Sequence, residues 1–544
     1  MSSVLLKNGF VHSPSDPFAE SILIEDGIVA WIGSDDSATS FMQRADRVID
    51  VDGALITPGF VDSHVHLLET ALVEDAVDVS PCAGGNSAEQ VIDMLGVRAR
   101  AWQPGDGVIC AHGYDDSAWT TASLTARDLE SVCGNVPVYV PRADLHSAII
   151  TSSLAQLAGV HNGCDSDSGR VVGAAHEQVR VTIREIPDQE RTRLYRTVLE
   201  SCARKGIVAV HENAAPGIDT LAGVAELMAM TQSLESGLPE VIGYFGAVME
   251  SEEQARETLT QVPGLRGFAG DLSVDGSFGS RSAALHAPYN DDPNTSGVLH
   301  LSAHQIETHL QACSQAGVQA GFHVIGDRGL TEILDAAERV IARDTTMASA
   351  FRRLGHRLEH VELASPNAIQ RLVQLGFSVS VQPAFDAHWG GPAGMYEQRL
   401  GVQRAHETTP LRDFLKAGIP MALGSDSPVT PIDPWGAVSA AVFHNNTEQR
   451  VSARAAFRAH TRGGWRVGGE ANPLVGDIRL GSPAHLAVWR ADALGVQAEN
   501  DGRSSWTTDA RSGSPLLPIL DEKGTRPACV ATLRSGFFLH DDLG

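Results

Sequence analysis

The chain holds 544 residues, with 67 acidic residues against 41 lysines and arginines, and its formal net charge is −26 at pH 7. A strongly acidic chain without a basic run argues against nucleic acid or an anionic membrane surface as a partner. The chain is too long to fold around one simple hydrophobic core, so two or three domains are expected.

The N-terminal segment has no sign of a targeting or membrane-spanning function. Met1–Phe10 carries one lysine and no long apolar core, unlike a signal peptide, and no apolar stretch is long enough to span a bilayer. The seven cysteines are scattered without a Cys-x-x-Cys pair. We therefore expect a reduced, cytoplasmic setting.

Both ends of the chain consist of short strand-like runs separated by turns. At the N-terminus these are Ser3–Leu6, Ser21–Ile24, Ile28–Ile32 and Arg47–Asp50. At the C-terminus they are His485–Trp489 and Val530–Leu533. We predict that residues 1–56 and 476–544 form one composite β-sandwich domain. The alternative is two independent terminal extensions.

The stretch from Thr57 to His66 begins with a Pro-Gly turn signal, continues as an apolar strand and ends in His-Val-His. Side chains two residues apart on a strand point to the same face, so His64 and His66 would converge on one point. Neutral imidazoles suit a Zn²⁺-like ion. An isolated His-x-His is more often two unrelated histidines, so the assignment depends on ligands elsewhere.

The middle of the chain repeats a short apolar strand followed by a helical segment. After the first strand, the candidates are Gly206–His211, Val241–Ala247, Phe268–Asp275, Val318–Val324, His356–Val361, Phe377–Pro383 and Ile419–Asp426. Helical patterns cover Ser302–Ala316, Gly329–Ala342, Ser365–Leu375 and Pro410–Ala417. Eight alternating units predict an α/β fold, a (β/α)₈ TIM-type barrel, over residues 57–475.

The connection from Leu67 to Lys205 is too long for a single crossover. It contains strand-like and helical runs of its own, so we predict an inserted subdomain (67–205) after strand 1, above the barrel mouth. Its residues Trp119, Arg142 and His146 are candidates for substrate binding. For each one alone, a structural role explains the sequence equally well.

In such barrels the chemistry lies at the carboxyl ends of the strands. The residues predicted there are His64, His66, His211, Glu212, Asp271, Asp275, His323, His360 and Asp426. Imidazole and carboxylate ligands suit zinc, which can leave one position open for water and lower the pKa of that water. Asp426, at the last strand end, is the candidate general base, with His360 as a second catalytic residue.

Five stretches together resemble a known family: Pro58–His66, Asp275–Arg281, His323–Asp327, Arg357–His360 and Gly424–Pro428. They resemble the amidohydrolase superfamily, and within it the amidohydrolase family 3 branch with its N-substituted formamide deformylase-like enzymes. The resemblance covers nearly the whole chain. It implies a distorted barrel, a composite β-sandwich and metal-dependent hydrolysis of an amide or similar C–N bond. We also predict that Arg281 binds substrate.

The chain departs from this family at one position. Many relatives carry a carboxylated lysine on strand 4 that bridges two metals, and Asp271 stands in its place by register with Asp275-Gly276-Ser277. We therefore expect one metal, held by His64, His66, His323 and Asp426, with His360 as a further ligand or hydrogen-bond donor. The alternative is Asp271 as a substitute bridge between two metals, with Glu212 and His211 as possible second-metal or supporting residues.

Three functions are compatible with these residues. The first is a hydrolase of amide, N-formyl, N-acyl or cyclic-amide small molecules, with one Zn²⁺ or similar divalent cation per chain. The second is a deaminase of an amino-heterocycle, and the third is a non-catalytic binding protein on the same fold. A small-molecule substrate is the expected partner, and a homodimer is compatible with the sequence.

Overall fold

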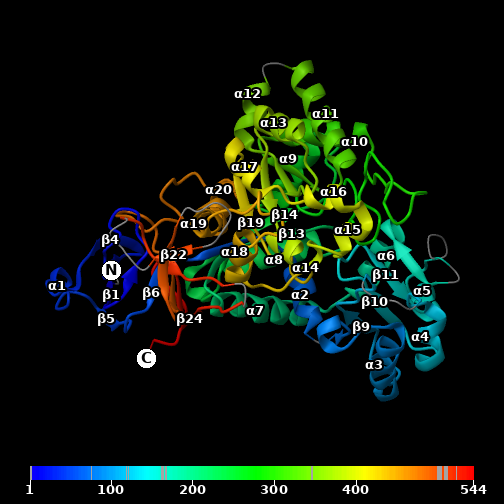
Figure 1. Cartoon of the computed structure of the whole chain (residues 1–544), viewed down its shortest axis with the longest axis horizontal. Coiled ribbons are helices and arrows are strands. Elements are labelled where there is room, and N and C mark those ends of the chain that lie inside the picture. Colours follow the sequence, from blue (N-terminus) through cyan, green and yellow to red (C-terminus); the bar gives the residue numbers. More distant parts are fainter. Residues whose placement is uncertain are drawn as a thin grey trace.

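The computed structural model describes all residues except 1–2, 75, 118, 120–121, 161–164, 166–167, 345–346, 499–504, 508–512, 522–523 and 544. Its centre is a sheet of eight strands in which all neighbours are parallel (Figure 1). In chain order these are β7 (Phe60–Val65), β13 (Ile207–Ala214), β14 (Glu240–Phe245), β15 (Gly267–Phe268), β16 (Gln319–Val324), β17 (Arg357–His360), β18 (Ser378–Val381) and β19 (Met421–Leu423).

The first and last strands meet, so the sheet is a nearly closed barrel. The backbone N–H of Asp426 donates to the carbonyl of His64 over 2.7 Å, and the N–H of His66 donates to the carbonyl of Ser427 over 3.0 Å. These bonds join the segment after β19 to the end of β7. The predicted (β/α)₈ barrel is confirmed.

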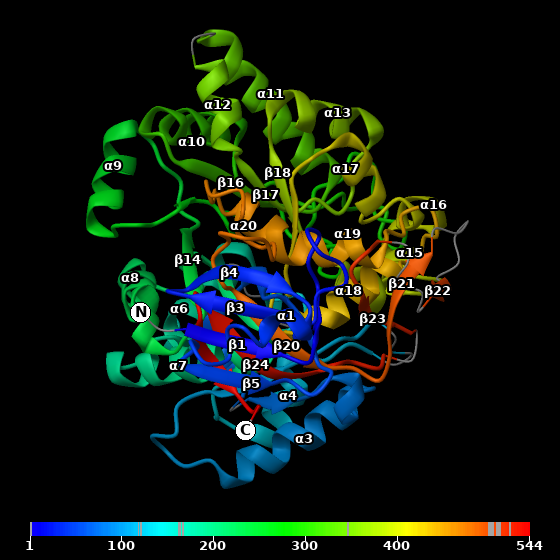
Figure 2. The same cartoon turned by 90° about the vertical axis from the view of Figure 1, so that its left-hand side faces the viewer.

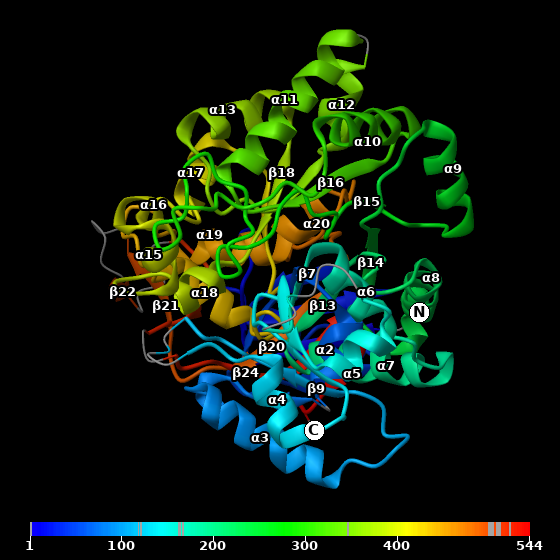
Figure 3. The ribbon, with the colours of Figure 1, turned by 90° about the vertical axis from the view of Figure 1, so that its right-hand side faces the viewer.

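Helices surround the strands on the outside of the barrel (Figure 3). The principal ones are α8 (Leu221–Gln232), α9 (Glu252–Gln261), α10 (Ala303–Ala316), α11 (Asp327–Arg343), α13 (Pro366–Leu375), α17 (Leu411–Ala417) and α18 (Pro434–Val442). Helix α10 shows how the sequence sets these bounds. Ser302 and Gln305 form a capping box at its start, and Gly317 ends it at φ 75°.

The fourth barrel strand is shorter than its sequence predicts. β15 ends at Phe268, because the backbone turns at Gly270 with φ 83°. Asp275, predicted at the end of this strand, instead accepts backbone N–H bonds from Ala284 (2.8 Å), Ile325 (2.9 Å) and Gly326 (2.8 Å). Asp275 therefore organises loops, and the assignment of a strand through it was wrong.

The two ends of the chain form a composite β-sandwich (Figure 2). One sheet has the order β4 (Ile28–Gly33), β3 (Ser21–Glu25), β1 (Ser3–Lys7), β5 (Arg47–Asp50). The other has the order β2 (Phe10–Val11), β6 (Leu55–Pro58), β20 (Leu486–Arg490), β24 (Ala528–Arg534), β25 (Phe537–Asp541). Leu6, Ile22, Leu486 and Leu533 share one core. Two independent terminal extensions are thereby excluded.

The inserted subdomain has its own sheet and apolar cores. The sheet order is β12 (Arg170–Val172), β11 (Ser147–Ile150), β10 (Val138–Pro141), β9 (Ile109–His112), β8 (Val77–Asp78). Helices α3 (Ala88–Ala101), α4 (Ala126–Cys133), α5 (Ser152–Leu157) and α6 (Gly173–Ile183) accompany it. By contrast, α2 (Leu67–Val73) and α7 (Asp188–Arg204) contribute side chains to the barrel core. The body of the insertion is therefore narrower than residues 67–205, and the exact domain boundaries stay a prediction.

No helix among the described residues is long and apolar enough to cross a membrane. The six described cysteines are free thiols, and Cys164 lies outside the described residues.

Candidate metal centre

Six ligand-type side chains meet where the carboxyl ends of the barrel strands converge. They are His64 and His66 on and after β7, Asp271 after β15, His323 on β16, His360 at the end of β17 and Asp426 after β19. The four histidines are at most 2% exposed. The Asp271 side chain, at 19%, is the more open member and faces the cavity.

Four of these side chains form a first donor group, made of His64, His66, Asp271 and Asp426. The two histidine Nε2 atoms lie 3.3 Å apart, and Asp271 oxygens lie 3.4 Å from His64 Nε2 and 3.3 Å from His66 Nε2. Asp426 Oδ1 lies 3.3 Å and 3.0 Å from the same two nitrogens. A tetrahedral zinc shell with bonds of about 2.0–2.1 Å separates its donor atoms by about 3.3 Å. The group thus fits a zinc-sized cation.

Asp271, His323 and His360 form a second donor group, whose ligand atoms all lie within 4.8 Å of one another. Asp271 Oδ1, His323 Nδ1 and His360 Nε2 are buried without a hydrogen-bond partner. Buried polar atoms without partners are rare, and an ion between them would account for these three. His323 therefore lies with Asp271 and His360 rather than beside His64 and His66. Asp271 belongs to both groups, and His360 also lies within 4.8 Å of ligand atoms of His64 and Asp426.

The ring nitrogen remote from the centre is hydrogen-bonded in three of the four histidines. His64 Nδ1–H donates to Glu359 Oε2 over 2.9 Å, and His360 Nδ1–H donates to Gln382 Oε1 over 2.7 Å. His323 Nε2–H donates to the carbonyl of Gly276 over 3.3 Å. Such bonds fix the tautomer that directs a lone pair toward a metal. The histidines are thus prepared for coordination.

An arginine and a glutamate beneath the centre support His64, and the sequence analysis did not identify either of them as functional. Arg357 is fully buried and donates to both carboxylate oxygens of Glu359, to the carbonyl of Ser63, and to His211 Nδ1 over 2.6 Å. Arg357 and Glu359 are two residues apart on β17, so their side chains point to the same face of the strand. That i, i+2 spacing is the signal that could have revealed them.

His211 and Glu212 belong to neither donor group. His211 accepts its bond from Arg357, and Glu212 accepts the backbone N–H of Leu67 over 2.8 Å. Both are fully buried on β13. The structure gives them supporting contacts rather than a place among the ligand atoms.

Opposite charges perturb the ionisation of the first donor group. Burial disfavours the charged form of His64, but the carboxylates of Asp426, Asp271 and Glu359 outweigh burial and raise the pKa of this imidazole well above its usual value. Burial acts to raise the pKa of Asp426, and its imidazole neighbours reverse this and lower it. A cation binding here would therefore displace protons from the histidines.

Glu359→Gln is expected to weaken metal binding by about 10- to 100-fold, because the charge that orients His64 and raises its basicity is lost. Titration of the metal-free protein against a chromophoric chelator measures this affinity. Glu307→Gln is the matched control, since Glu307 is also buried and accepts bonds from Arg339 (2.9 Å) and Arg343 but contacts no ligand histidine. If Glu359→Gln bound the metal as tightly as wild type, the role assigned to Glu359 in supporting His64 would be contradicted.

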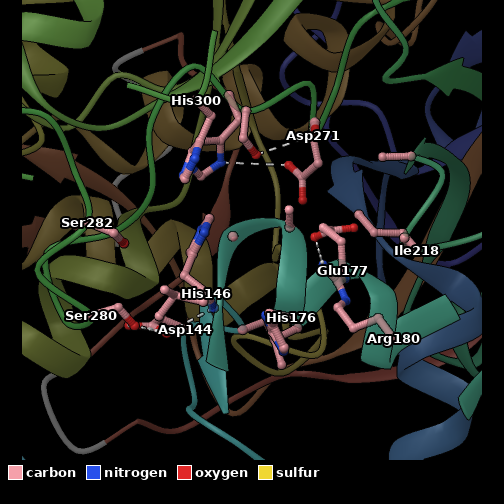
Figure 4. Close-up of a pocket in the computed structure, with 18 of the residues that line it drawn as sticks. Asp144, His146, His176, Glu177, Arg180, Ile218, Asp271, Ser280, Ser282 and His300 are labelled. Atoms are coloured by element: carbon pink, nitrogen blue, oxygen red, sulfur yellow. Dashed lines mark hydrogen bonds and ion pairs between the residues drawn. The ribbon is translucent and has the colours of Figure 1, made fainter. Parts of the chain in front are cut away.

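A cavity of about 830 Å³ opens over the metal centre (Figure 4). Its floor includes His66, Asp271, His323 and Asp426, and its wall includes residues of the inserted subdomain: Asp144, His146, Arg170, His176, Glu177 and Arg180. The insertion therefore lies at the mouth of the barrel, on the same side as the metal centre.

The four residues predicted to bind substrate lie in different environments in the structure. His146 and Arg281 line the cavity, although Arg281 is paired with Asp291 over 2.8 Å. Arg142 lies behind the wall, where it binds Asp115, Asp116 and Asp144. Trp119 packs in the subdomain, with its ring 5.5 Å from that of Tyr114. Of the four, His146 is the one beside the metal centre, with its ring 4.8 Å from that of His323.

The chain is similar to known proteins in both fold and sequence. The fold is similar to that of an uncharacterized metal-dependent hydrolase from Pyrococcus horikoshii OT3, with a TM-score of 0.68 at 24% identity, covering 90% of this chain and 98% of that one. An N-substituted formamide deformylase from Arthrobacter pascens is 23% identical over 506 residues (88% of this chain, 91% of that protein). The putative amidohydrolase YtcJ of Bacillus subtilis is 25% identical over 463 residues (79% and 81%). Because the amidohydrolase family model matches residues 47–537, the chain belongs to the amidohydrolase family.

Proposed function

We propose that this metal-dependent hydrolase cleaves the C–N bond of an amide, N-formyl, N-acyl or cyclic-amide small molecule. The observation that carries the proposal is the first donor group, whose two imidazoles and two carboxylates are spaced for a zinc-like cation at the floor of a cavity. The similarity to a formamide deformylase supports an amide-type substrate.

The residues of the metal centre have different roles in the proposed reaction. A divalent cation held by His64, His66, Asp271 and Asp426 would supply a Lewis acid that makes water more acidic and polarises a carbonyl group. Asp426 is placed to take a proton from the attacking water and pass it to the leaving nitrogen. His360, whose Nδ1–H is bonded to Gln382 and whose Nε2 lone pair has no partner, is placed to be a further ligand.

We propose one tightly bound ion per chain. In the first group, the two imidazole nitrogens lie 3.3 Å from each other and 3.0–3.4 Å from oxygens of Asp271 and Asp426, whereas His323 Nδ1 and Asp271 Oδ1 in the second group are 3.8 Å apart. The first position therefore needs less rearrangement to bind a cation, and it should fill first.

A substrate panel tests the reaction class. Zinc-loaded protein is incubated with N-formylamines, N-acylamines, cyclic amides and amino-heterocycles, and amine, carboxylate and ammonia are measured. Release of amine together with formate or another carboxylate, or ring opening, is the expected result. Ammonia release from amino-heterocycles alone would replace the proposal with deamination. No turnover by metal-loaded protein would favour a binding function.

Removing the body of the insertion, residues 77–183, should leave a folded barrel that binds metal but has lost substrate selectivity, because the insertion has its own cores. A short Gly-Ser linker would replace it, in a Glu69→Gln background, because the deletion removes Arg180 of α6 and leaves Arg184 as the remaining partner of buried Glu69. Circular dichroism and metal analysis check folding and binding. A shortened chain that aggregates or binds no metal would show that the barrel depends on the insertion.

A further inference from the structure

We propose that His146, on the inserted subdomain, is a catalytic residue whose ring N–H donates a hydrogen bond to the carbonyl oxygen of the substrate. This inference rests on the proposed amide hydrolysis and adds a specific role to it. As water attacks the carbonyl carbon, negative charge develops on this oxygen. A donor fixed at that position stabilises the transition state more than the substrate.

The position of His146 supports a role in substrate contact. It lies in the loop between β10 and β11 and faces the large cavity, which also exposes Asp271, His323 and Asp426 (Figure 4). It also lines a smaller adjoining cavity together with His323, His360 and Asp426. A carbonyl group held at the metal centre would therefore lie beside this imidazole.

The ring of His146 is free to bind a substrate. Among the described residues, no hydrogen bond or ion pair occupies either ring nitrogen, and His146 belongs to neither donor group. Two of its polar neighbours in the cavity wall are already engaged. His176 Nε2 bonds the hydroxyl of Tyr139 over 2.8 Å, and Arg180 is held by Glu69.

The loop that carries His146 contains an energetically unfavourable backbone conformation. Leu145, directly before it, has φ 54°, which a branched side chain rarely adopts. The N–H of Leu145 donates to the carbonyl of Arg142 over 2.8 Å, and the N–H of His146 donates to Asp144 Oδ1 over 3.1 Å. Such local strain persists where the surrounding contacts fix it, and it occurs often at functional sites.

Polar contacts from both the insertion and the barrel fix this loop. Asp144 accepts bonds from Ser277 Oγ (2.8 Å) and Ser280 Oγ (3.0 Å), which follow β15, and from Arg142 Nε (3.2 Å). Arg142 in turn binds Asp115 and Asp116 within the insertion. His146 is thus held in one place before substrate arrives, which is the condition for effective electrostatic stabilisation.

The test compares His146→Ala and His146→Gln with wild type in two assays. With the best substrate from the panel, kcat should fall by about 10²-fold in His146→Ala with a small change in KM. His146→Gln, which keeps an amide donor, should recover part of this loss. In the second assay, acetohydroxamate is titrated into cobalt-loaded protein and followed by visible absorption. Its Kd should rise by about tenfold in His146→Ala, on the scale of one lost hydrogen bond.

His112→Ala is the control, because His112 is also on the insertion but lies outside both cavities. It should match wild type in both assays. Unchanged kcat and acetohydroxamate affinity in His146→Ala would overturn the proposal, and so would loss of the metal, since His146 would then act as a ligand. If His146→Ala did not fold, His146→Gln and His146→Asn would be tested in its place. The proposal would be overturned if both variants bound acetohydroxamate as tightly as wild type. Weakened acetohydroxamate binding without turnover of any panel compound would support the contact and overturn the amide substrate.

Discussion

Replacing His64 and His66 together by alanine is expected to remove the tightly bound metal and to abolish measurable hydrolysis. The two Nε2 atoms are 3.3 Å apart at the floor of the cavity, and each is within 3.4 Å of both Asp271 and Asp426. Without them, two carboxylates remain in the first group, and these alone are poor ligands for zinc compared with a mixed imidazole and carboxylate set.

Elemental analysis of the purified protein measures the metal content per chain. One ion in wild type and close to none in the double variant is the expected result. A double variant that keeps its metal would refute the ligand assignment. Two ions in wild type would contradict the one-metal proposal and assign the second ion to Asp271, His323 and His360.

The matched control for this experiment is His309→Ala with His356→Ala. Both imidazoles are fully buried in the barrel wall and bond backbone groups, His309 Nε2 to the carbonyl of Phe268 and His356 Nδ1 to the N–H of Ala320. Their removal should lower thermal stability by a comparable amount and leave the metal content unchanged. Metal loss in the control would show that destabilisation alone releases the ion.

The strand and helix pattern predicted the barrel well because burial on both faces makes parallel strands continuous apolar runs. It failed at β15, where Gly270 turns the chain and Asp275 accepts three backbone N–H bonds instead of ending a strand. It also assigned α2 and α7 to the insertion, since the sequence does not show that their apolar faces pack against the barrel.

The sequence predicted which residues contribute to the metal centre better than it predicted which of them lie together around one ion. His64 and His66 converge because they are two residues apart on one strand, a relation that the sequence contains. Whether His323 joins them depends on how far neighbouring strands are staggered around the barrel, which no local pattern specifies. For the same reason the contacts of Glu359 with His64, and of Arg357 with His211, become visible only in the fold.

Asp426→Asn is expected to keep the metal and to lose about 10²-fold or more in turnover, the usual scale for a positioned acid or base. The substitution preserves size and one oxygen for coordination but cannot accept a proton. Asp426 is well placed for this role, since its Oδ1 contacts both His64 and His66, and neighbouring imidazoles lower its pKa, so that it is ionised at neutral pH.

A purely structural role for Asp426 would be to cap the loop that follows β19. The contacts argue against it, because Ser425 Oγ accepts the N–H of Ser427 (3.1 Å), and Asp62 Oδ1 accepts the N–H of Ser425 (2.9 Å). Asp219→Asn is the control, a buried carboxylate that binds Tyr195 and Thr220 away from the metal centre. Steady-state kinetics with metal content measured in parallel decides the matter. If Asp426→Asn turned over substrate as fast as wild type, the base would have to be another group at the centre. The candidates are Asp271, which lines the larger cavity, and His360, which lines the smaller one.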